Sequence, residues 1–240
     1  MTNLLYQLDS YMQSFEAKVA HVDLENHGLI LDQTVFYPGG GGQPTDRGFL
    51  THLHNRYLVS RARKVGSDVL HLLEGDEPLP SEGSIVTGQI DWTRRYQLMR
   101  THTAMHILCG VIFRDYGAQV TGGDMDPLQG RMDFEFETMR RELVEEIQTS
   151  INQEVRNSRD VRVSILPRAE AFQIPDLIRT KINLLPEGIQ EVRVVEIVGL
   201  DLQADGGTHV KNTSEVGKIR VTDYKSKGKI NKRIYVELSE

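Results

Sequence analysis

The chain has 240 residues, of which 39% are hydrophobic and 26% are charged, and its formal net charge is −6. This size and composition suit a soluble protein of one large domain or two small ones. No apolar run approaches the ~20 residues of a membrane span, and no basic segment followed by an apolar stretch marks a secretory signal. The single cysteine, Cys109, excludes an intramolecular disulfide framework and is expected to be a small core residue rather than a nucleophile. We therefore expect a cytoplasmic protein without membrane contact.

The first 90 residues are predicted to be rich in β-strands. Short runs of alternating apolar residues lie between turn signals, at residues 17–23, 28–32, 57–60, 68–73 and 85–91. Several short strands at this spacing are typical of a small barrel. We predict an N-terminal β-barrel domain over residues 1–90, after which Asp91 can cap a helix.

A glycine segment interrupts this region, and it reads Phe-Tyr-Pro-Gly-Gly-Gly-Gly-Gln-Pro-Thr-Asp-Arg-Gly over residues 36–48. Consecutive glycines leave backbone N–H groups unobstructed, which favours a loop that approaches a substrate closely. Gln43, Thr45 and Asp46 would then be the polar groups that select the substrate. The alternative is a wide hairpin connection. No Gly-Lys-Ser/Thr follows, which excludes a P-loop.

The rest of the chain, residues 91–240, is predicted to be a domain of helices and a mainly antiparallel sheet, so the fold class is α+β. A helix is expected from about Trp92 to Tyr116, with Gly117 as its C-cap. Its apolar positions recur at helical spacing: Leu98, Met105, Leu108 and Ile112. The further elements are a strand near 131–136, a helix at 139–157, a strand at 161–166, a helix at 168–181, a strand at 192–197, a ligand loop at 201–209, and strands at 217–221 and 233–238.

Two pairs of polar residues, His102 with His106 and Asp205 with His209, share a spacing of four. On a helix this spacing places both imidazoles on one face, here expected at the border of the buried face. Eight histidines in 240 residues give roughly 0.3 such pairs by chance, so one pair alone indicates surface or packing histidines more readily than a site. The second pair, which encloses two glycines, favours a metal centre. Zinc accepts imidazole nitrogen and carboxylate oxygen, and other divalent transition metals would also be tolerated.

The segment from Lys211 to Val236 is basic although the whole chain is acidic. It contains eight basic and two acidic residues. Such asymmetry is typical either of a phosphate-facing patch or of a solvated edge hairpin that discourages aggregation.

Three segments resemble the editing domain of alanyl-tRNA synthetase: His-Thr-Ala-Met-His at 102–106, Gly-Gly-Thr-His-Val at 206–210 and Thr-Ser-Glu-Val-Gly at 213–217. Residues 41–48 resemble the glycine motif of the free-standing AlaX proteins. The resemblance covers nearly the whole chain in the same order, and it is closest to the medium-length class, which carries an N-terminal barrel and an editing domain.

The resemblance implies trans-editing, the hydrolysis of the ester that joins serine or glycine to alanine tRNA. It implies one zinc ion per chain, with His102, His106, Asp205 and His209 as ligands. The family usually has cysteine where this chain has Asp205. A carboxylate leaves the ion harder and more Lewis acidic than a thiolate does, so zinc occupancy could fall or metal preference could change.

Selection of serine over alanine requires a group that hydrogen-bonds the serine hydroxyl. The candidates on the second domain are Gln119, Thr121 and Thr103, of which Thr121 is preferred, and Gln43 and Asp46 are those of the glycine segment. Arg100 and Arg131 could contact the acceptor end of the tRNA, and no obligate protein partner is evident.

Two other functions remain open. Because Asp205 replaces the usual cysteine, the chain could be a catalytically weak or inactive metalloprotein that binds tRNA. It could also be an unrelated zinc hydrolase that acts on a small ester or amide.

Overall fold

The computed structural model describes residues 1–179 and 188–239. It is an α+β protein with a closed barrel early in the chain, as predicted. Contacts between residues divide the chain into two compact units, Met1–Tyr96 and Gln97–Glu240, so the division falls within helix α1 (Trp92–Tyr116). Among the described residues, no helix has the length and apolar character needed to cross a membrane.

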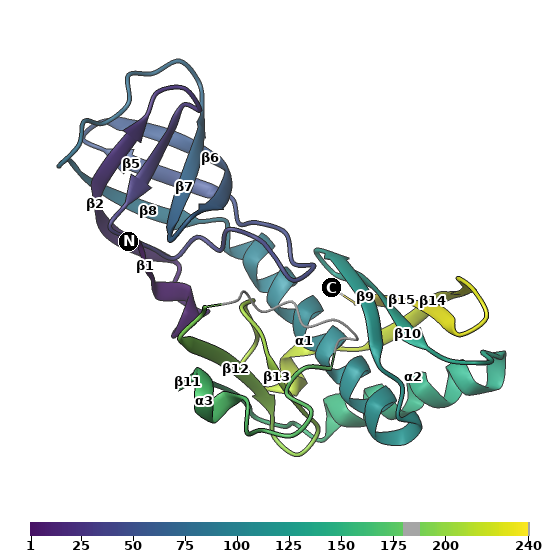
Figure 1. Cartoon of the computed structure of the whole chain (residues 1–240). Coiled ribbons are helices and arrows are strands. Elements are labelled where there is room, and N and C mark those ends of the chain that lie inside the picture. The colour runs from purple at the N-terminus through teal and green to yellow at the C-terminus, as the bar shows by residue number, and fades with distance from the viewer. Residues whose placement is uncertain (180–187, 240) are drawn as a thin grey trace. The chain divides into compact units, whose positions relative to one another are not determined.

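The first unit is built on a closed barrel of six antiparallel strands in the order β2-β3-β7-β6-β5-β8 (Figure 1). The strands are β2 (Ser14–Asp23), β3 (Gly28–Leu31), β5 (Gly48–His52), β6 (Asn55–Val65), β7 (Asp68–Glu74) and β8 (Ile85–Ile90). Two short strands, β1 (Asn3–Leu4) and β4 (Gln33–Thr34), pair in parallel outside the barrel, and a 3-10 turn, η1, covers Leu5–Gln7. Alternate residues of β2 and β8 are buried, because successive side chains of a strand point to opposite faces. Strand β5 was not predicted.

The second unit contains two antiparallel sheets. Four strands form the order β14-β15-β10-β9 and three form β11-β12-β13. Their bounds are β9 (Val120–Asp126), β10 (Gln129–Glu135), β11 (Val161–Pro167), β12 (Glu191–Ile197), β13 (Asp201–Ala204), β14 (Ile219–Ser226) and β15 (Asn231–Leu238). The helices are α2 (Arg141–Arg156), α3 (Arg168–Ala171) and the 3-10 turn η2 (Thr213–Val216).

Helix α1 has the predicted bounds and the predicted caps. The Oδ1 atom of Asp91 accepts a hydrogen bond from the Arg94 N–H over 3.1 Å, and Gly117 ends the helix with a φ of 64°. The expectation that the histidines lie at the border of a buried face was wrong. Every residue from 101 to 112 is buried, because this stretch of the helix is surrounded on all sides.

Two predicted elements differ from the structure. The helix expected at 168–181 is the single turn α3, which ends at Ala171; residues 180 and 181 lie outside the described residues. Pro175 explains the early end, because proline removes a backbone donor and disfavours helical geometry in the residue before it. The expected loop at 201–209 begins with a strand, since β13 pairs with β12.

Candidate metal centre

The structure brings His102, His106, Asp205 and His209 together. One ligand atom from each residue lies within 4.8 Å of the others. The first two project from consecutive turns of α1, and the other two follow the end of β13. All three imidazoles are buried, with exposed fractions of 3–6%.

Hydrogen bonds fix which nitrogen of two imidazoles faces the cluster. The Nδ1 atom of His106 lies 2.9 Å from Oδ2 of Asp201, and Nδ1 of His209 lies 3.2 Å from Oγ1 of Thr103. Their Nε2 atoms are therefore left for the cluster. The Nε2 atom of His102 points the same way, at 3.6 Å from Oδ1 of Asp205.

The carboxylate of Asp205 is held from several sides. Its Oδ2 atom accepts a hydrogen bond from the Gly207 N–H over 2.7 Å and lies 3.0 Å from Nε2 of His209. Arg193 of β12 donates to the backbone carbonyl of Asp205 over 2.9 Å, and its Nη1 atom is 3.7 Å from Oδ2. The carboxylate is thus oriented before any ion binds, and a buried cation stands beside it.

Asp201 was missed by the sequence analysis. Its side chain is fully buried, and it also accepts a hydrogen bond from Gln203 over 2.7 Å and faces Arg179 at 3.6 Å. A carboxylate behind a histidine ligand fixes the ring and raises its basicity. The only signal in the sequence is an acidic residue at the start of a short strand, where acidic residues are uncommon.

Gly110 allows this carboxylate to approach α1. It lies one helical turn after His106, and a Cβ atom at this position would be 3.0 Å from Cβ of Asp201 and 2.9 Å from Cγ of Leu200. Both distances are shorter than ordinary carbon contacts. The absence of a side chain at residue 110 therefore permits the short distance between Asp201 and His106.

Local electrostatics favour the metal-binding protonation states of His102, His209 and Asp205, but not that of His106. Burial lowers the pKa of His102 well below its ordinary value, and burial lowers that of His209 to about 4. Burial also opposes protonation of His106, but the hydrogen bond and charge of Asp201 raise the pKa of that ring overall. Burial alone would raise the pKa of Asp205, yet His102 and His209 lower it well below its usual range. Neutral imidazoles and an ionised carboxylate are the forms that bind metals.

Comparisons with known proteins place this chain in a family. Residues 192–235 match the second additional domain of threonyl and alanyl tRNA synthetases, and residues 5–94 match class II (A) tRNA synthetases. The alanyl-tRNA editing protein AlaX-M of Saccharolobus solfataricus is 39% identical over 237 residues, which is 98% of each chain. The chain belongs to the AlaX-M family. The AlaX-M protein of Methanosarcina barkeri is 38% identical over 99% of each chain.

This chain also matches one part of a larger enzyme. The alanine–tRNA ligase of Pyrobaculum aerophilum is 40% identical over 227 residues, which is 92% of this chain and 25% of the ligase. The resemblance stated from the motifs is confirmed by these relatives.

In this AlaX-M chain the donor set of the cluster fits a zinc ion. Zinc bonds to nitrogen and oxygen of about 2.0–2.1 Å give tetrahedral edges of about 3.3 Å, and the cluster atoms, within 4.8 Å of one another, need only close inward. Cys109, the one thiol in the chain, is 2% exposed, and burial raises its pKa, so it offers no thiolate.

The predicted serine-selecting residues of the second unit occupy different environments. Thr103 is buried and faces His209, so it orients that imidazole. Thr121 and Gln119 are exposed at β9, where the Thr121 hydroxyl donates to Asn231 over 3.0 Å. Neither belongs to the four-residue cluster.

The glycine segment of this AlaX-M chain forms a tight turn in which Gly40 and Gln43 exchange backbone hydrogen bonds of 2.9 and 3.0 Å. Gln43 is 2% exposed. Both carboxylate oxygens of Asp46 accept from Arg95, each 3.0 Å from Nε, and Oδ2 also accepts from the Tyr37 N–H. Asp46 thereby anchors the segment to the start of α1.

At least four of the eight cations in the basic segment at 211–236 are held by contacts within the fold. Three of its cations form ion pairs: Arg220 with Glu237, Lys225 with Asp223, and Arg233 with Asp133. Lys232 is 5% exposed and donates to two backbone carbonyls. Arg100 donates to the carbonyls of Val216 and Ser239, so it closes the end of the chain onto α1.

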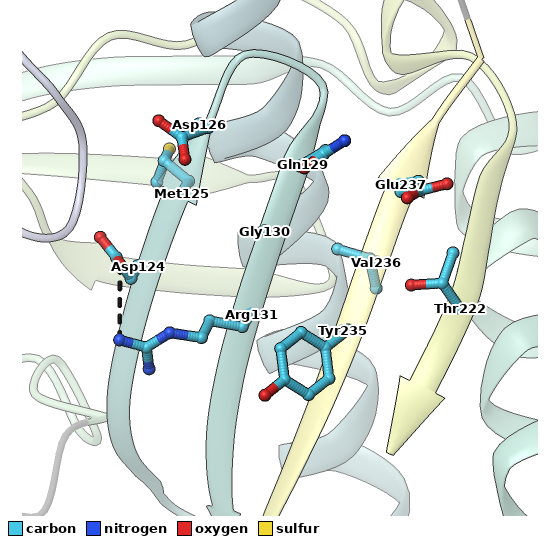
Figure 2. Close-up of a pocket in the computed structure, with 10 residues that line it drawn as sticks. All are labelled: Asp124, Met125, Asp126, Gln129, Gly130, Arg131, Thr222, Tyr235, Val236 and Glu237. Atoms are coloured by element: carbon cyan, nitrogen blue, oxygen red, sulfur yellow. Dashed lines mark hydrogen bonds and ion pairs between the residues drawn. The ribbon is translucent and has the colours of Figure 1, made fainter. Parts of the chain in front are cut away.

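A hollow of about 210 Å³ lies on the sheet that contains this segment (Figure 2). Its lining includes three carboxylates, those of Asp124, Asp126 and Glu237, and one cation, Arg131, which pairs with Asp124 at 3.4 Å. An acidic lining repels a polyanion, so this hollow is not suited to bind the phosphate backbone of a nucleic acid.

Proposed function

We propose that this chain is a trans-editing hydrolase that removes serine or glycine from alanine tRNA. The observation that carries the proposal is the buried cluster of three histidines and one carboxylate, in a chain similar over its full length to alanyl-tRNA editing proteins. An aminoacyl ester is an activated bond, so a single site with modest assistance can hydrolyse it.

One zinc ion per chain would be held by His102, His106, Asp205 and His209. Bound zinc supplies Lewis acidity and a charge that orients either a water molecule or the substrate. The protein's own contribution is positional. Asp201 and Thr103 hold two imidazoles with Nε2 inward, and Arg193 and Gly207 hold the Asp205 carboxylate.

Selection of serine is proposed to involve Thr121 and Gln119 of the second unit and Gln43 of the glycine segment. A group that hydrogen-bonds the serine hydroxyl would reject alanine, which leaves that group unpaired. Asp46 would act through the shape of the segment, because Arg95 and the Tyr37 N–H already occupy its carboxylate.

A deacylation assay tests the proposal. The zinc-loaded protein is mixed with alanine tRNA charged with serine, glycine or alanine, and release of each amino acid is followed with and without a chelator. We expect rapid release of serine or glycine, slow release of alanine, and loss of activity with the chelator. Tight tRNA binding without turnover would instead support a non-catalytic metalloprotein, and hydrolysis of small esters alone would support an unrelated zinc hydrolase.

The variant His106→Ala tests the ligand set. It should lose most of the bound zinc, measured by elemental analysis, and all deacylation, because four-coordinate sites lose affinity steeply with each ligand. The matched control is His54→Ala, since His54 is exposed in the barrel unit. Full zinc content in His106→Ala would show that His106 is not a zinc ligand.

A further inference from the structure

Strand β6 of the barrel is unusually basic. Between Asn55 and Val65 it carries four basic residues and no acidic one, although the chain as a whole has a charge of −6. Three of the four, Arg56, Arg61 and Lys64, are exposed, and Arg63 bonds to Asn26. The strand therefore exposes Arg56 and Arg61 along its length and Lys64 near its end.

These exposed cations lie outside the ion pairs of the described part of the chain. Within residues 1–179 and 188–239, no ion pair involves Arg56, Arg61 or Lys64, nor the neighbouring Arg47. In the basic segment near the C-terminus, three of the eight cations are in ion pairs and a fourth is buried. Unpaired cations can bind an external anion without first breaking an internal ion pair.

An aromatic side chain lies among these cations. The guanidinium of Arg56 stacks over the ring of Phe49 with 3.6 Å between the guanidinium carbon and the ring centroid. Both residues line a groove of about 530 Å³, together with Arg47 and Leu58, and Leu58 is 37% exposed. A flat cation on an aromatic ring, beside an exposed apolar side chain, is a surface on which a nucleobase can stack.

Two carboxylates also line the groove, Glu74 and Asp91. Asp91 is engaged at the N-terminus of α1, where it accepts from the Arg94 N–H. Glu74 lies opposite Leu58 in the register of β6 and β7. The charges of the groove itself thus balance, and the excess positive charge comes from Arg61 and Lys64 farther along β6.

We propose that Arg47, Phe49, Arg56, Leu58, Arg61 and Lys64, which we name the β6 surface, dock the tRNA. The cations contact phosphates of the RNA backbone, and one unpaired base stacks on the Arg56–Phe49 pair. Single-stranded RNA is recognised in this way, by stacking on aromatic and guanidinium planes beside cations that hold the backbone. The inference rests on the proposed function for the identity of the RNA.

The double variant Arg56→Gln/Arg61→Gln tests the surface. Binding of uncharged alanine tRNA is measured at several salt concentrations, by filter binding or fluorescence anisotropy. Each lost phosphate contact should weaken binding about tenfold at 0.1 M salt and lower the slope of log affinity against log salt by about 0.7–0.9. Zinc content and thermal unfolding should remain those of the unsubstituted protein.

The matched control is Arg140→Gln/Arg141→Gln, which removes two exposed arginines that face Glu142 and Glu145. This control should leave affinity and salt slope unchanged. A second variant, Phe49→Ala, should weaken tRNA binding without changing the salt slope, because it removes stacking and no charge. Equal losses in the test and control doubles would mean that only net charge matters, and the β6 surface would be rejected.

The deacylation assay separates this inference from the proposed function. If the protein hydrolyses serine from the tRNA, the double variant should raise KM and leave kcat unchanged. Unchanged KM and affinity would overturn the docking surface alone. Specific tRNA binding that depends on β6, in a protein without turnover, would overturn the hydrolase and support the surface.

Discussion

Asp201 determines which nitrogen of His106 faces the cluster. Its Oδ2 atom lies 2.9 Å from Nδ1, and the carboxylate is fully buried. Gln203 and Arg179 hold the carboxylate in turn. A ligand that is oriented in this way loses little rotational freedom when an ion binds.

Replacement Asp201→Asn should weaken zinc binding about 10- to 100-fold, because loss of a charged partner behind a histidine ligand has this effect in metal sites. The dissociation constant is measured by competition with a fluorescent zinc chelator. Asp126→Asn, an exposed change in the same unit, serves as the control. An unchanged dissociation constant would show that Asp201 has a purely structural role.

Asp205→Cys should preserve or tighten zinc binding, since thiolate is the softer and stronger zinc ligand. The same competition assay, repeated with manganese, should show a shift of preference toward zinc. Loss of the site would contradict a ligand role for Asp205 and would point to another task for its carboxylate, such as that of a general base.

The backbone of the glycine segment adopts a conformation that few residues other than glycine can take. Gly39, Gly40, Gly41 and Gly42 have φ values of 87°, 134°, 56° and 86°, a region that L side chains rarely adopt. Four successive residues in this region indicate that the shape of the turn, rather than its flexibility, is what the glycines provide.

The double variant Gly40→Ala/Gly41→Ala should change the ratio of serine to alanine hydrolysis more than it changes zinc content. The added methyl groups strain the turn that contains Gln43. The ratio of kcat/KM for the two charged tRNAs is the measurement. Gly66→Ala, at a φ of 61° in the turn between β6 and β7, imposes similar strain elsewhere. If this ratio equals that of Gly66→Ala, the glycine segment only connects strands and does not affect the choice of amino acid.

At the scale of the whole molecule, the barrel unit contains a buried titratable group, His71 of β7. Its ring nitrogens lie 2.8 Å from Oγ1 of Thr34 and 3.0 Å from the carbonyl oxygen of Leu29. Burial lowers the pKa of His71 to about 4. The folded protein therefore keeps this ring neutral at a pH where the unfolded chain binds a proton.

Stability should fall as the pH drops from about 6.5 toward 4, by roughly 3 kcal/mol in total from this group, since only the unfolded state gains a proton. Urea unfolding is followed by the fluorescence of Trp92, the single tryptophan, which packs against the barrel core. His71→Gln should reduce the loss of unfolding free energy between pH 6.5 and 4.5, whereas His54→Gln should leave that loss unchanged. A pH dependence unchanged by His71→Gln would contradict the assignment.

Local patterns predicted the helix α1 and most strands, because periodicity and capping residues such as Asp91 and Gly117 act over a few neighbours. The pairing of residues 102 and 106 with 205 and 209 followed from spacing and family resemblance. Asp201 and Arg193 could not be found in this way, because their contacts depend on how β12 and β13 pack against α1. That the exposed cations of β6 form no ion pair among the described residues likewise depends on where folding places the carboxylates.

Gly110 has a consequence for attempts to make this protein more heat-resistant. A glycine within a long helix is an obvious target, since alanine gains about 1 kcal/mol of helix propensity. Here the methyl group would meet Leu200 and Asp201 at 2.9 and 3.0 Å. The variant would gain rigidity in the helix and lose alignment of His106, so selection for thermal tolerance and selection for metal retention would favour opposite residues at this one position.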